Sequence, residues 1–237
     1  GFFKKRQEII NGVKVIRVPL IPRGSGRGLL LVLNYLSFVF FSYFAVLFRI
    51  KEKFDLIFVQ QLSPVTMALP GLWVKKRQNI PLVLWVLDLW PESLIASSNI
   101  KKGVLINYLE NLVKKIYSKS DIILISSKFF ERTIIEKCLD KNKRIEYFPN
   151  WAEDIFVTKI NNIEIPKLPM GFNVMFAGNI GDSQDFEAIL EAAELTKNQG
   201  VNWILVGDGR KVSWIKKQIK HRNIDNVVLM GRHSLES

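Results

Sequence analysis

The sequence predicts an α/β protein made of two units in tandem, each built on a mostly parallel sheet. Two observations lead to this fold class. Short runs of consecutive apolar residues, typical of strands buried on both faces, alternate with segments of helical length. The alternation stops after Pro149 and resumes at Phe172, which indicates a linker between the two units.

The first unit is expected to cover residues 1–150. Its strands are predicted at residues 13–18, 55–59, 82–87 and 121–125. Its helices are predicted at residues 29–50, 65–77, 101–119 and 127–139. Because strands that alternate with helices pair in parallel through right-handed crossovers, all four strands are expected in one sheet.

The second unit is expected to cover residues 172–237, after a linker at 151–171. Its strands are predicted at 172–177, 202–206 and 226–230, and its helices at about 184–199 and 211–221. Two Rossmann-like units in tandem result. The chain opens without methionine and stops soon after its last strand, so we expect an interior fragment whose second unit is cut short.

The composition limits the chemistry of the protein. With 48% hydrophobic and 24% charged residues, the chain is folded rather than disordered. Its one cysteine, Cys138, cannot form an intrachain disulfide, and two histidines do not supply an all-protein zinc site. A reducing compartment fits these counts.

The positive charge is concentrated near the amino terminus. Residues 1–53 contain ten Lys or Arg against Glu8 and Glu52, and so hold +8 of the net charge of +12. Such a concentration attracts nucleic acid, an anionic lipid surface or a diphosphate-bearing substrate. Charge alone does not distinguish these three partners.

The segment 29–50 is apolar, rich in phenylalanine, and free of charge before Arg49. Its length allows a membrane span, a buried core helix, or a crossover helix whose outer face enters the lipid interface. Three polar residues interrupt the segment, both flanks are basic, and it lies between two strands of one expected sheet. We therefore predict attachment to an anionic membrane surface through residues 23–53.

A first candidate site follows a strand of the first unit, in Asp88-Leu-Trp-Pro-Glu-Ser93. Ligands of open parallel sheets bind beyond the carboxyl ends of the strands, so Asp88 and Glu92 are expected to face a crevice. A plain capping role for Asp88 is an equal alternative. The segment Phe148-Pro-Asn150-Trp151 marks the exit of the unit, and a turn is the simpler explanation for it.

Two further candidate sites are turns between a strand and a helix in the second unit. The first turn contains Gly178, Asn179 and Gly181, and glycine lets the backbone approach a ligand while the following helix offers N–H groups to a phosphate. The second contains Gly207, Asp208, Gly209 and Arg210, whose guanidinium can bind a diphosphate. Tight turns and a solvated arginine are the alternatives for these residues.

The order of these motifs is more specific than any one of them. A strand that ends in Asp88-Leu-Trp-Pro-Glu-Ser93, then Pro149-Asn-Trp151, then Ala177-Gly-Asn-Ile-Gly181, then Val206-Gly-Asp-Gly209 resembles the retaining glycosyltransferases of family 4. The resemblance covers nearly the whole chain. It is similar above all to bacterial sugar transferases of O-antigen and capsule assembly, including L-fucosamine transferases.

The resemblance implies a GT-B fold, with the acceptor held mainly by the first unit and the nucleotide-sugar donor by the second. Asp88 and Glu92 would then be catalytic, with Trp90 and Asn150 on the acceptor side of the cleft. The donor diphosphate would lie against Gly178, Asn179 and Gly181, and the nucleotide near residues 207–210. Many relatives have a histidine near the position of Asp88, so this sequence departs from them there.

The resemblance also implies a reaction. A sugar, expected as its UDP derivative, would pass with retained configuration to a polyprenyl-diphosphate-linked acceptor at the cytoplasmic face of the cell membrane. N–H dipoles and cations, rather than a metal, would stabilise the leaving diphosphate, so no cofactor is expected.

Two departures from the family pattern and two alternative functions bear on this interpretation. The glycine turn of the family's first strand and its paired-glutamate segment are absent from the sequence, so the fragment itself is expected to be inactive. A basic nucleic-acid-binding module is one alternative, although the basic residues do not interleave with aromatic residues suited to base stacking, and no nucleic acid is expected as partner. A non-catalytic membrane-associated subunit is the other.

Overall fold

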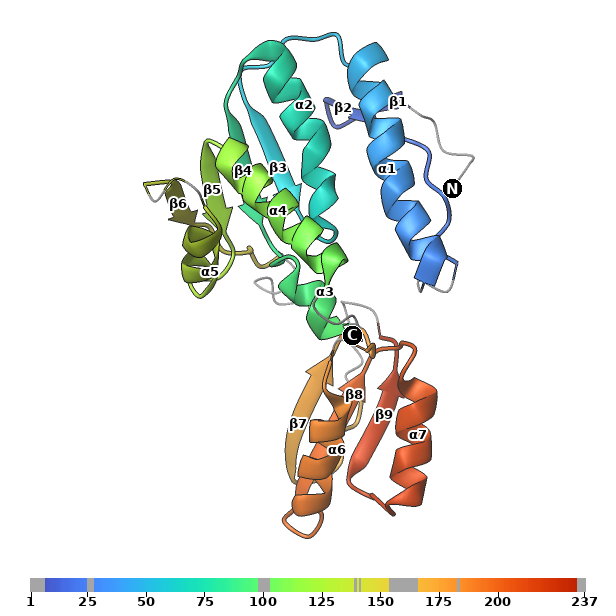
Figure 1. Ribbon diagram of the computed structural model, residues 1–237. Helices are drawn as coiled ribbons and strands as arrows, with labels where there is room; N and C mark the ends of the chain where they lie inside the picture. Colours follow the sequence, from blue (N-terminus) through green and yellow to red (C-terminus); the bar gives the residue numbers. More distant parts are fainter. Residues whose placement is uncertain are drawn as a thin grey trace. The chain divides into compact units, whose positions relative to one another are not determined.

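The computed structural model describes residues 7–24, 28–97, 103–138, 140, 142–153, 166–182 and 184–233. The chain divides into two compact units, Gly1–Asn150 and Trp151–Ser237. Each unit contains a parallel sheet with helices against it (Figure 1). The residues between 153 and 166, which form most of the predicted linker, lie outside the described part of the chain.

The first unit is built on a four-stranded parallel sheet. Its strands, in spatial order, are β3 (Ile57–Gln61), β4 (Leu82–Val86), β5 (Ile122–Ile125) and β6 (Arg144–Tyr147). All five residues of β4 are buried, because this strand lies inside the sheet and both of its faces are covered. Because the strands are parallel, their carboxyl ends lie at the same edge of the sheet.

The helices of the first unit cover this sheet, most of them directly and the first by packing on other helices. They are α1 (Gly28–Phe48), the 3-10 helix η1 (Val65–Ala68), α2 (Leu69–Gln78), α3 (Glu92–Ser97), α4 (Val104–Lys119) and α5 (Phe130–Lys137). Buried residues recur every three or four positions along α4, so that one side of this helix enters the core beside α2 (Figure 1). On the opposite face of the sheet, the ring of Trp85 packs edge-on against Phe148.

The start of the chain differs from the prediction. Residues 13–18 were expected in the parallel sheet, but β2 (Val13–Ile16) pairs antiparallel with β1 (Gln7–Ile10) in a separate two-stranded sheet. The reason is the Asn11-Gly12 pair between them, whose φ angles of 50° and 80° fit the two-residue turn of a β-hairpin. The parallel-sheet prediction for this segment is wrong.

Helix α1 is consequently not a crossover between two strands of one sheet. It packs beside α2 and η1, and Arg77 of α2 donates hydrogen bonds to the carbonyls of Val46 and Ile50 at its carboxyl end, the second at 2.6 Å. By length and composition, residues Leu29–Phe48 could also cross a membrane, and only 28% of their most apolar window is buried.

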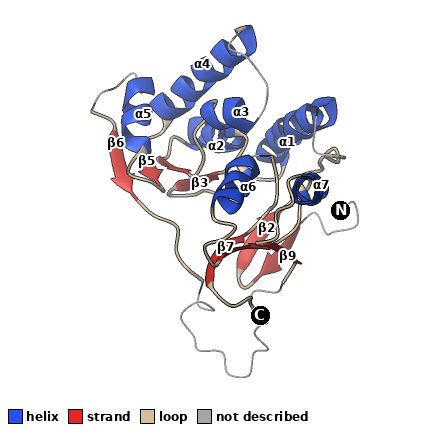
Figure 2. Ribbon diagram, turned by 90° about the horizontal axis from the view of Figure 1, so that it is seen from below, coloured by secondary structure: helices blue, strands red, loops and turns tan. Residues whose placement is uncertain are grey.

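The second unit contains a three-stranded parallel sheet. Its strands are β7 (Phe172–Ala177), β8 (Val201–Val206) and β9 (Val227–Gly231), in that order. Helices α6 (Phe186–Leu195) and α7 (Val212–His221) lie on one face of this sheet (Figure 2). Their buried side chains form the core with Ile180 and Leu205.

Most of the remaining elements are confirmed within a few residues of the predicted bounds. The structure adds α3 and β6, which the sequence did not indicate. Strand β6 lies at the edge of the sheet with three of its four residues exposed, so it lacks the continuous apolar run used to predict the other strands.

Candidate functional site

Asp88 lies just beyond β4, at the edge where the parallel strands end. Its carboxylate oxygen Oδ2 accepts a hydrogen bond of 3.2 Å from the indole N–H of Trp90, which also lies 3.2 Å from Ser63 Oγ. Trp90 is only 5% exposed, so its ring cannot turn freely. The buried tryptophan therefore orients the carboxylate of Asp88.

A buried glutamine fastens the same turn from the neighbouring strand. The side-chain nitrogen Nε2 of Gln61, the last residue of β3, donates to the carbonyl of Asp88 at 3.0 Å and to that of Leu62 at 2.6 Å. The backbone carbonyl of Gln61 accepts from the N–H of Leu87 at 3.0 Å. Hydrogen bonds with Gln61 thus fix the backbone of Leu87 and Asp88 to the end of β3.

Lys137, at the end of α5, is a site residue that the sequence analysis missed. Its ammonium group lies 2.9 Å from the carbonyl of Trp90 and 2.6 Å from Glu92 Oε2, and its side chain is 12% exposed. Glu92, predicted as a catalytic residue beside Asp88, is therefore held in an ion pair that joins α3 to α5. Because 45 residues separate the two partners, no local pattern could have indicated the pair.

Tyr117 places a buried hydroxyl near these groups. Burial raises the pKa of Tyr117, and the negative charges of Glu92 and Asp88 raise it further. The hydroxyl therefore stays protonated. Among the residues that the structure describes, it has no hydrogen-bond partner.

Asn150 lies at the end of the first unit, three residues beyond β6, and is exposed. The chain is fixed just before it, because the indole N–H of Trp85 donates to the carbonyl of Phe148 at 2.9 Å. Asn150 thus leaves the same edge of the sheet that carries Asp88. The structure does not bring the two side chains into contact in any described interaction.

In the second unit, the two predicted glycine turns pack against each other through their backbones. The N–H of Ile180 donates to the carbonyl of Asp208 at 2.9 Å. A Cβ atom on Gly207 would lie 1.9 Å from the carbonyl oxygen of Gly178, and one on Gly209 would lie 2.1 Å from that of Ile180. Gly207 also has a φ of +132°, so glycine is required there for two reasons.

The other residues of the first turn shape its outer surface. Asn179 is exposed, and its carbonyl accepts the N–H of Gly181 at 3.0 Å. Gly178 continues β7 by donating to the carbonyl of Val206 at 2.9 Å. A close approach of backbone to ligand, as predicted for this turn, is geometrically open at Gly178 and Asn179.

Charged side chains surround the second turn. Arg210 Nη2 lies 3.3 Å from Asp182 Oδ2, and Arg232 Nε lies 3.9 Å from Asp208 Oδ2. All four side chains are partly exposed, so these ion pairs are weak. An anion that reached the turn could replace Asp182 as the partner of the Arg210 guanidinium.

The amino ends of the two helices differ, and this corrects one expectation. The helix after residues 178–181 was expected to offer N–H groups to a phosphate, but Asp185 Oδ1 already accepts from the N–H of Ala188 at 3.2 Å. Glu187 in the same turn is paired with Arg222. Helix α7 has no side-chain cap and no acidic residue in its first turn, so its amino end is the more favourable for an anion.

The structure thus gathers the predicted residues into two groups. Asp88, Trp90 and Glu92 lie together in the first unit. The seven predicted donor-binding residues lie together in the second, on its two adjoining turns. Within the described residues, no group of three or more His, Cys, Asp or Glu is placed to hold a metal ion.

Comparisons with known proteins identify the family. Residues 5–151 match the model of the glycosyl transferase 4-like domain. Over 156 residues the chain is 31% identical to "Probable glycosyltransferase WbjE" of Pseudomonas aeruginosa, a match that covers 63% of this chain and 39% of the relative. It is 22% identical over 116 residues to WcaI of Escherichia coli (strain K12), named for colanic acid biosynthesis, covering 45% and 28% of the two chains.

Two solved structures share the fold. Anabaena Alr3699/HepE, solved in complex with UDP-glucose, superposes with a TM-score of 0.56 at 15% identity, over 88% of this chain and 54% of that one. TarM superposes with a TM-score of 0.56 at 16% identity, over 81% of this chain and 36% of that one.

The chain spans well under half the length of the curated relatives it matches. The family match nevertheless covers more than half of the chain, including the whole group around Asp88. The chain therefore belongs to the glycosyl transferase 4-like family and has the α/β architecture of the GT-B glycosyltransferases.

Proposed function

We propose that this chain is part of a retaining glycosyltransferase. It moves a sugar from a nucleotide-sugar donor, UDP-linked, to a lipid-linked oligosaccharide acceptor in the synthesis of a cell-surface polysaccharide. The observation that carries the proposal is the pair of interlocked glycine turns at residues 178–181 and 207–210, beside Arg210 and the uncapped start of α7.

The second unit is suited to the donor. Glycines keep side chains away from the turns, so a diphosphate can approach their backbone, and Arg210 and Lys211 supply positive charge at the start of α7. The HepE complex with UDP-glucose, which shares the fold, supports a nucleotide-sugar ligand. We place the donor diphosphate nearer to α7 than to α6, because Asp185 already caps the start of α6.

The first unit is suited to the acceptor. Trp90 holds Asp88 Oδ2, which leaves Oδ1 to accept a hydrogen bond from the hydroxyl group of the acceptor sugar. Glu92 is held by Lys137, so its contribution is to fix the turn that carries Asp88. Of the two predicted catalytic carboxylates, Asp88 is the one that we propose contacts substrate.

The reaction requires stabilisation of the charge that develops on the leaving diphosphate. Backbone N–H groups of the glycine turns and the guanidinium of Arg210 can supply it without reorganising during the reaction. We propose that these groups take the place of a divalent metal ion. The oxocarbenium-like sugar keeps its anomeric configuration when the acceptor enters from the side that the diphosphate leaves.

The proposed location is the cytoplasmic face of the cell membrane, with α1 in the lipid interface. Helix α1 leaves large apolar side chains exposed along its length, including Leu29, Leu36, Phe40 and Leu47. Its other side packs on α2 and η1, which supports an interfacial position over a span or an ordinary core helix. Arg23, Arg49 and the lysines after them would contact anionic head groups.

The decisive experiment uses the complete enzyme, a panel of UDP- and GDP-sugars, and a polyprenyl-diphosphate-linked acceptor. We expect transfer from one UDP-sugar, insensitive to EDTA, and a product whose anomeric configuration, measured by NMR, equals that of the donor. An inverted product would reject the retaining mechanism, and transfer lost with EDTA would reject the metal-free route.

The role of Asp88 is tested by Asp88→Asn in the same enzyme. The amide keeps an oxygen for Trp90 but loses the charge, so we expect turnover to fall by about a hundredfold or more with an unchanged melting temperature. The exposed Asp55→Asn is the matched control. Near-normal turnover of Asp88→Asn would remove this residue from the mechanism.

Membrane attachment is tested separately with the 237-residue chain. We expect it to co-sediment with vesicles of phosphatidylglycerol and phosphatidylcholine, and to be partly released by salt. Binding to random duplex DNA at physiological ionic strength, without binding to these vesicles, would favour the nucleic-acid alternative instead.

A further inference from the structure

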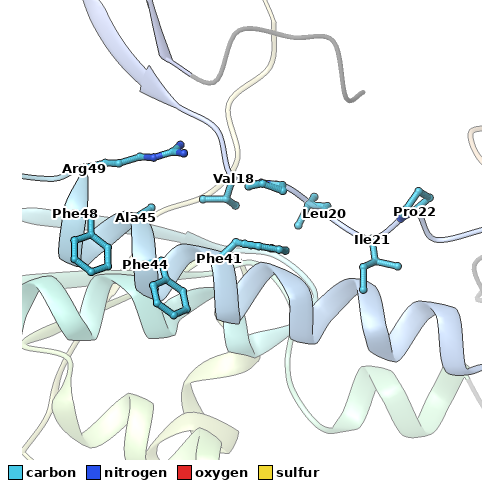
Figure 3. Close-up of a pocket in the computed structure, with 10 residues that line it drawn as sticks. Val18, Leu20, Ile21, Pro22, Phe41, Phe44, Ala45, Phe48 and Arg49 are labelled. Atoms are coloured by element: carbon cyan, nitrogen blue, oxygen red, sulfur yellow. The ribbon is translucent and has the colours of Figure 1, made fainter.

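An apolar groove runs along α1 in the first unit. It has a volume of about 600 Å³, within the range of small-molecule sites, and lies between α1 and the extended segment 18–22 (Figure 3). Phe41, Phe44 and Phe48 line it from α1, and Val18, Leu20 and Ile21 line it from the segment.

Buried polar side chains hold the far wall of the groove in place. Ser37 Oγ accepts the N–H of Ile21 at 3.0 Å, and Asn34 Nδ2 donates to the carbonyl of Ile21 at 2.5 Å. Both side chains are buried within an otherwise apolar helix. The polar interruptions of the apolar segment thus fix the segment 18–22 at a set distance from α1, and the groove is a built feature of the unit.

Among the described residues that line the groove, Arg49 is the one that carries a charge. Its Nη1 lies 3.4 Å from the carbonyl of Arg17, and within the described residues no carboxylate pairs with it. The acidic side chains nearby in sequence have other partners, because Glu8 pairs with Arg17 and Glu52 with Lys14. The groove therefore combines an apolar lining with a cation that no carboxylate of the described residues neutralises.

We propose that this groove binds one hydrocarbon chain of an anionic phospholipid, with the phosphate of the lipid at Arg49. The proposal rests on the interfacial position of α1 proposed above. The groove opens beside the exposed apolar side chains of α1, so a membrane lipid can enter it without crossing water. The neighbouring Lys51 and Lys53 add to the preference for negative head groups.

The position of Arg49 favours a phospholipid over the lipid carrier of the acceptor. Helix α1 ends near the amino-terminal ends of the sheet strands, as Figure 1 shows, whereas Asp88 follows the carboxyl end of β4. A phosphate at Arg49 would therefore lie at the opposite end of the unit from the proposed acceptor site. The groove thus holds a lipid that attaches the protein, not its substrate.

The test is photo-crosslinking of the 237-residue chain in phosphatidylcholine vesicles that contain phosphatidylglycerol with a diazirine on one acyl chain. We expect the labels to map to the groove residues of α1 and of segment 18–22. Labels confined to the exposed residues Leu36, Phe40 and Leu47 would overturn the proposal, since those residues would meet any bilayer.

Two variants occupy the groove. Ala45→Phe fills it from α1, and Leu20→Asp introduces a charge from the partly exposed segment, which tolerates change if the first variant fails to fold. We expect each to lower groove labelling per bound molecule at least fivefold. The control Leu36→Asp, outside the groove, is expected to weaken vesicle binding while the labelling per bound molecule stays unchanged. Unchanged labelling in both groove variants would reject the site.

The charge is tested by matched substitutions. Arg49→Gln is expected to lower the preference for phosphatidylglycerol over phosphatidylcholine threefold or more, with recovery in Arg49→Lys, whereas Lys53→Gln removes an equal charge with less effect. Equal losses would reject the assignment of the phosphate to Arg49. Displacement of the label by polyprenyl phosphate, but not by unlabelled phosphatidylglycerol, would assign the groove to the lipid carrier.

These outcomes are distinct from those of the proposed function. Absence of groove labelling with intact sugar transfer and vesicle binding would remove the lipid site alone. Loss of vesicle binding altogether would remove the interfacial position of α1, and leave the transfer reaction to be decided by its own assay.

Discussion

The two units differ in the part of the chain that forms the candidate site, which is side chain in the first unit and backbone in the second. In the first unit, side chains form the site: Trp90, Gln61 and Lys137 hold the turn that carries Asp88. In the second unit, the backbone forms it, because Gly207 and Gly209 pack directly on the carbonyls of the opposite turn. The comparison suggests that small substitutions in the first site shift its geometry but let it form. In the second site there is no room for an added atom.

The sharpest way to break this comparison is Gly207→Ala. The new Cβ would lie 1.9 Å from the Gly178 carbonyl oxygen at a φ of +132°, so we expect the second unit to lose about 3 kcal/mol or more. Urea unfolding measures this loss. Gly200→Ala is the control, since its φ is +68° but no atom lies within 4 Å of the added Cβ, and about 1 to 2 kcal/mol is expected. Equal losses would mean that the turns do not interlock.

A smaller effect is expected from Lys137→Met in the first unit. It keeps the apolar stem but leaves Glu92 and the Trp90 carbonyl without their donor, so we expect about 1 to 2 kcal/mol of destabilisation. In the complete enzyme, turnover should fall about tenfold with little change in the donor KM. Arg132→Met on the same helix removes an equal charge from an exposed pair, in which the Arg132 side chain is 90% and the Glu136 side chain 63% exposed, and should cost under about 0.5 kcal/mol.

The second site can be sharpened by its charges. Arg210→Gln should weaken UDP binding to the chain by about fivefold, or about 1 kcal/mol. Asp182→Asn should strengthen it by about twofold, because it frees the guanidinium of Arg210. Calorimetric titration with UDP measures both. The essential result is that the two substitutions change the affinity for UDP in opposite directions. A lower affinity in Asp182→Asn would show that Arg210 does not act on the diphosphate.

The smallest effect concerns acid stability. Burial alone would raise the pKa of Asp121, but hydrogen bonds from Lys75 and from the N–H of Leu82 hold it below its ordinary value of 3.8. A carboxylate with a lowered folded pKa adds stability that is present above pH 3.8 and is lost as the pH falls through the folded pKa. Asp121→Asn should therefore reduce stability near neutral pH, with a difference that shrinks below pH 3.8. Asp225→Asn, whose carboxylate is 70% exposed and 3.6 Å from Lys197, is the control.

The parallel strands could be predicted from sequence because burial on both faces leaves a continuous apolar run, as in β4. The glycine turns could be predicted because each follows such a strand. The hairpin at the start carried its own signal, Asn11-Gly12, which outweighs the apolar pattern of residues 13–18. That signal was available in the sequence and was not used.

The partners of Asp88 could not be predicted. Gln61 reaches its carbonyl from the end of a strand 27 residues away, and Lys137 reaches the adjoining Glu92 from the end of a helix 45 residues away. Such contacts depend on the tertiary arrangement, not on a local period. The cap of α6 by Asp185 is different, since an acidic residue just before a helix is a readable signal that argues against a phosphate there.

Helix α1 is tied to its unit by Asn34, Ser37 and the carbonyls that Arg77 binds. None of these ties involves the outward side chains at Leu36, Phe40 or Leu47. Selection can therefore alter the outer surface of this helix, residue by residue, without penalty to folding. In the interfacial position proposed for α1, this surface would be free to vary with the lipids that it meets.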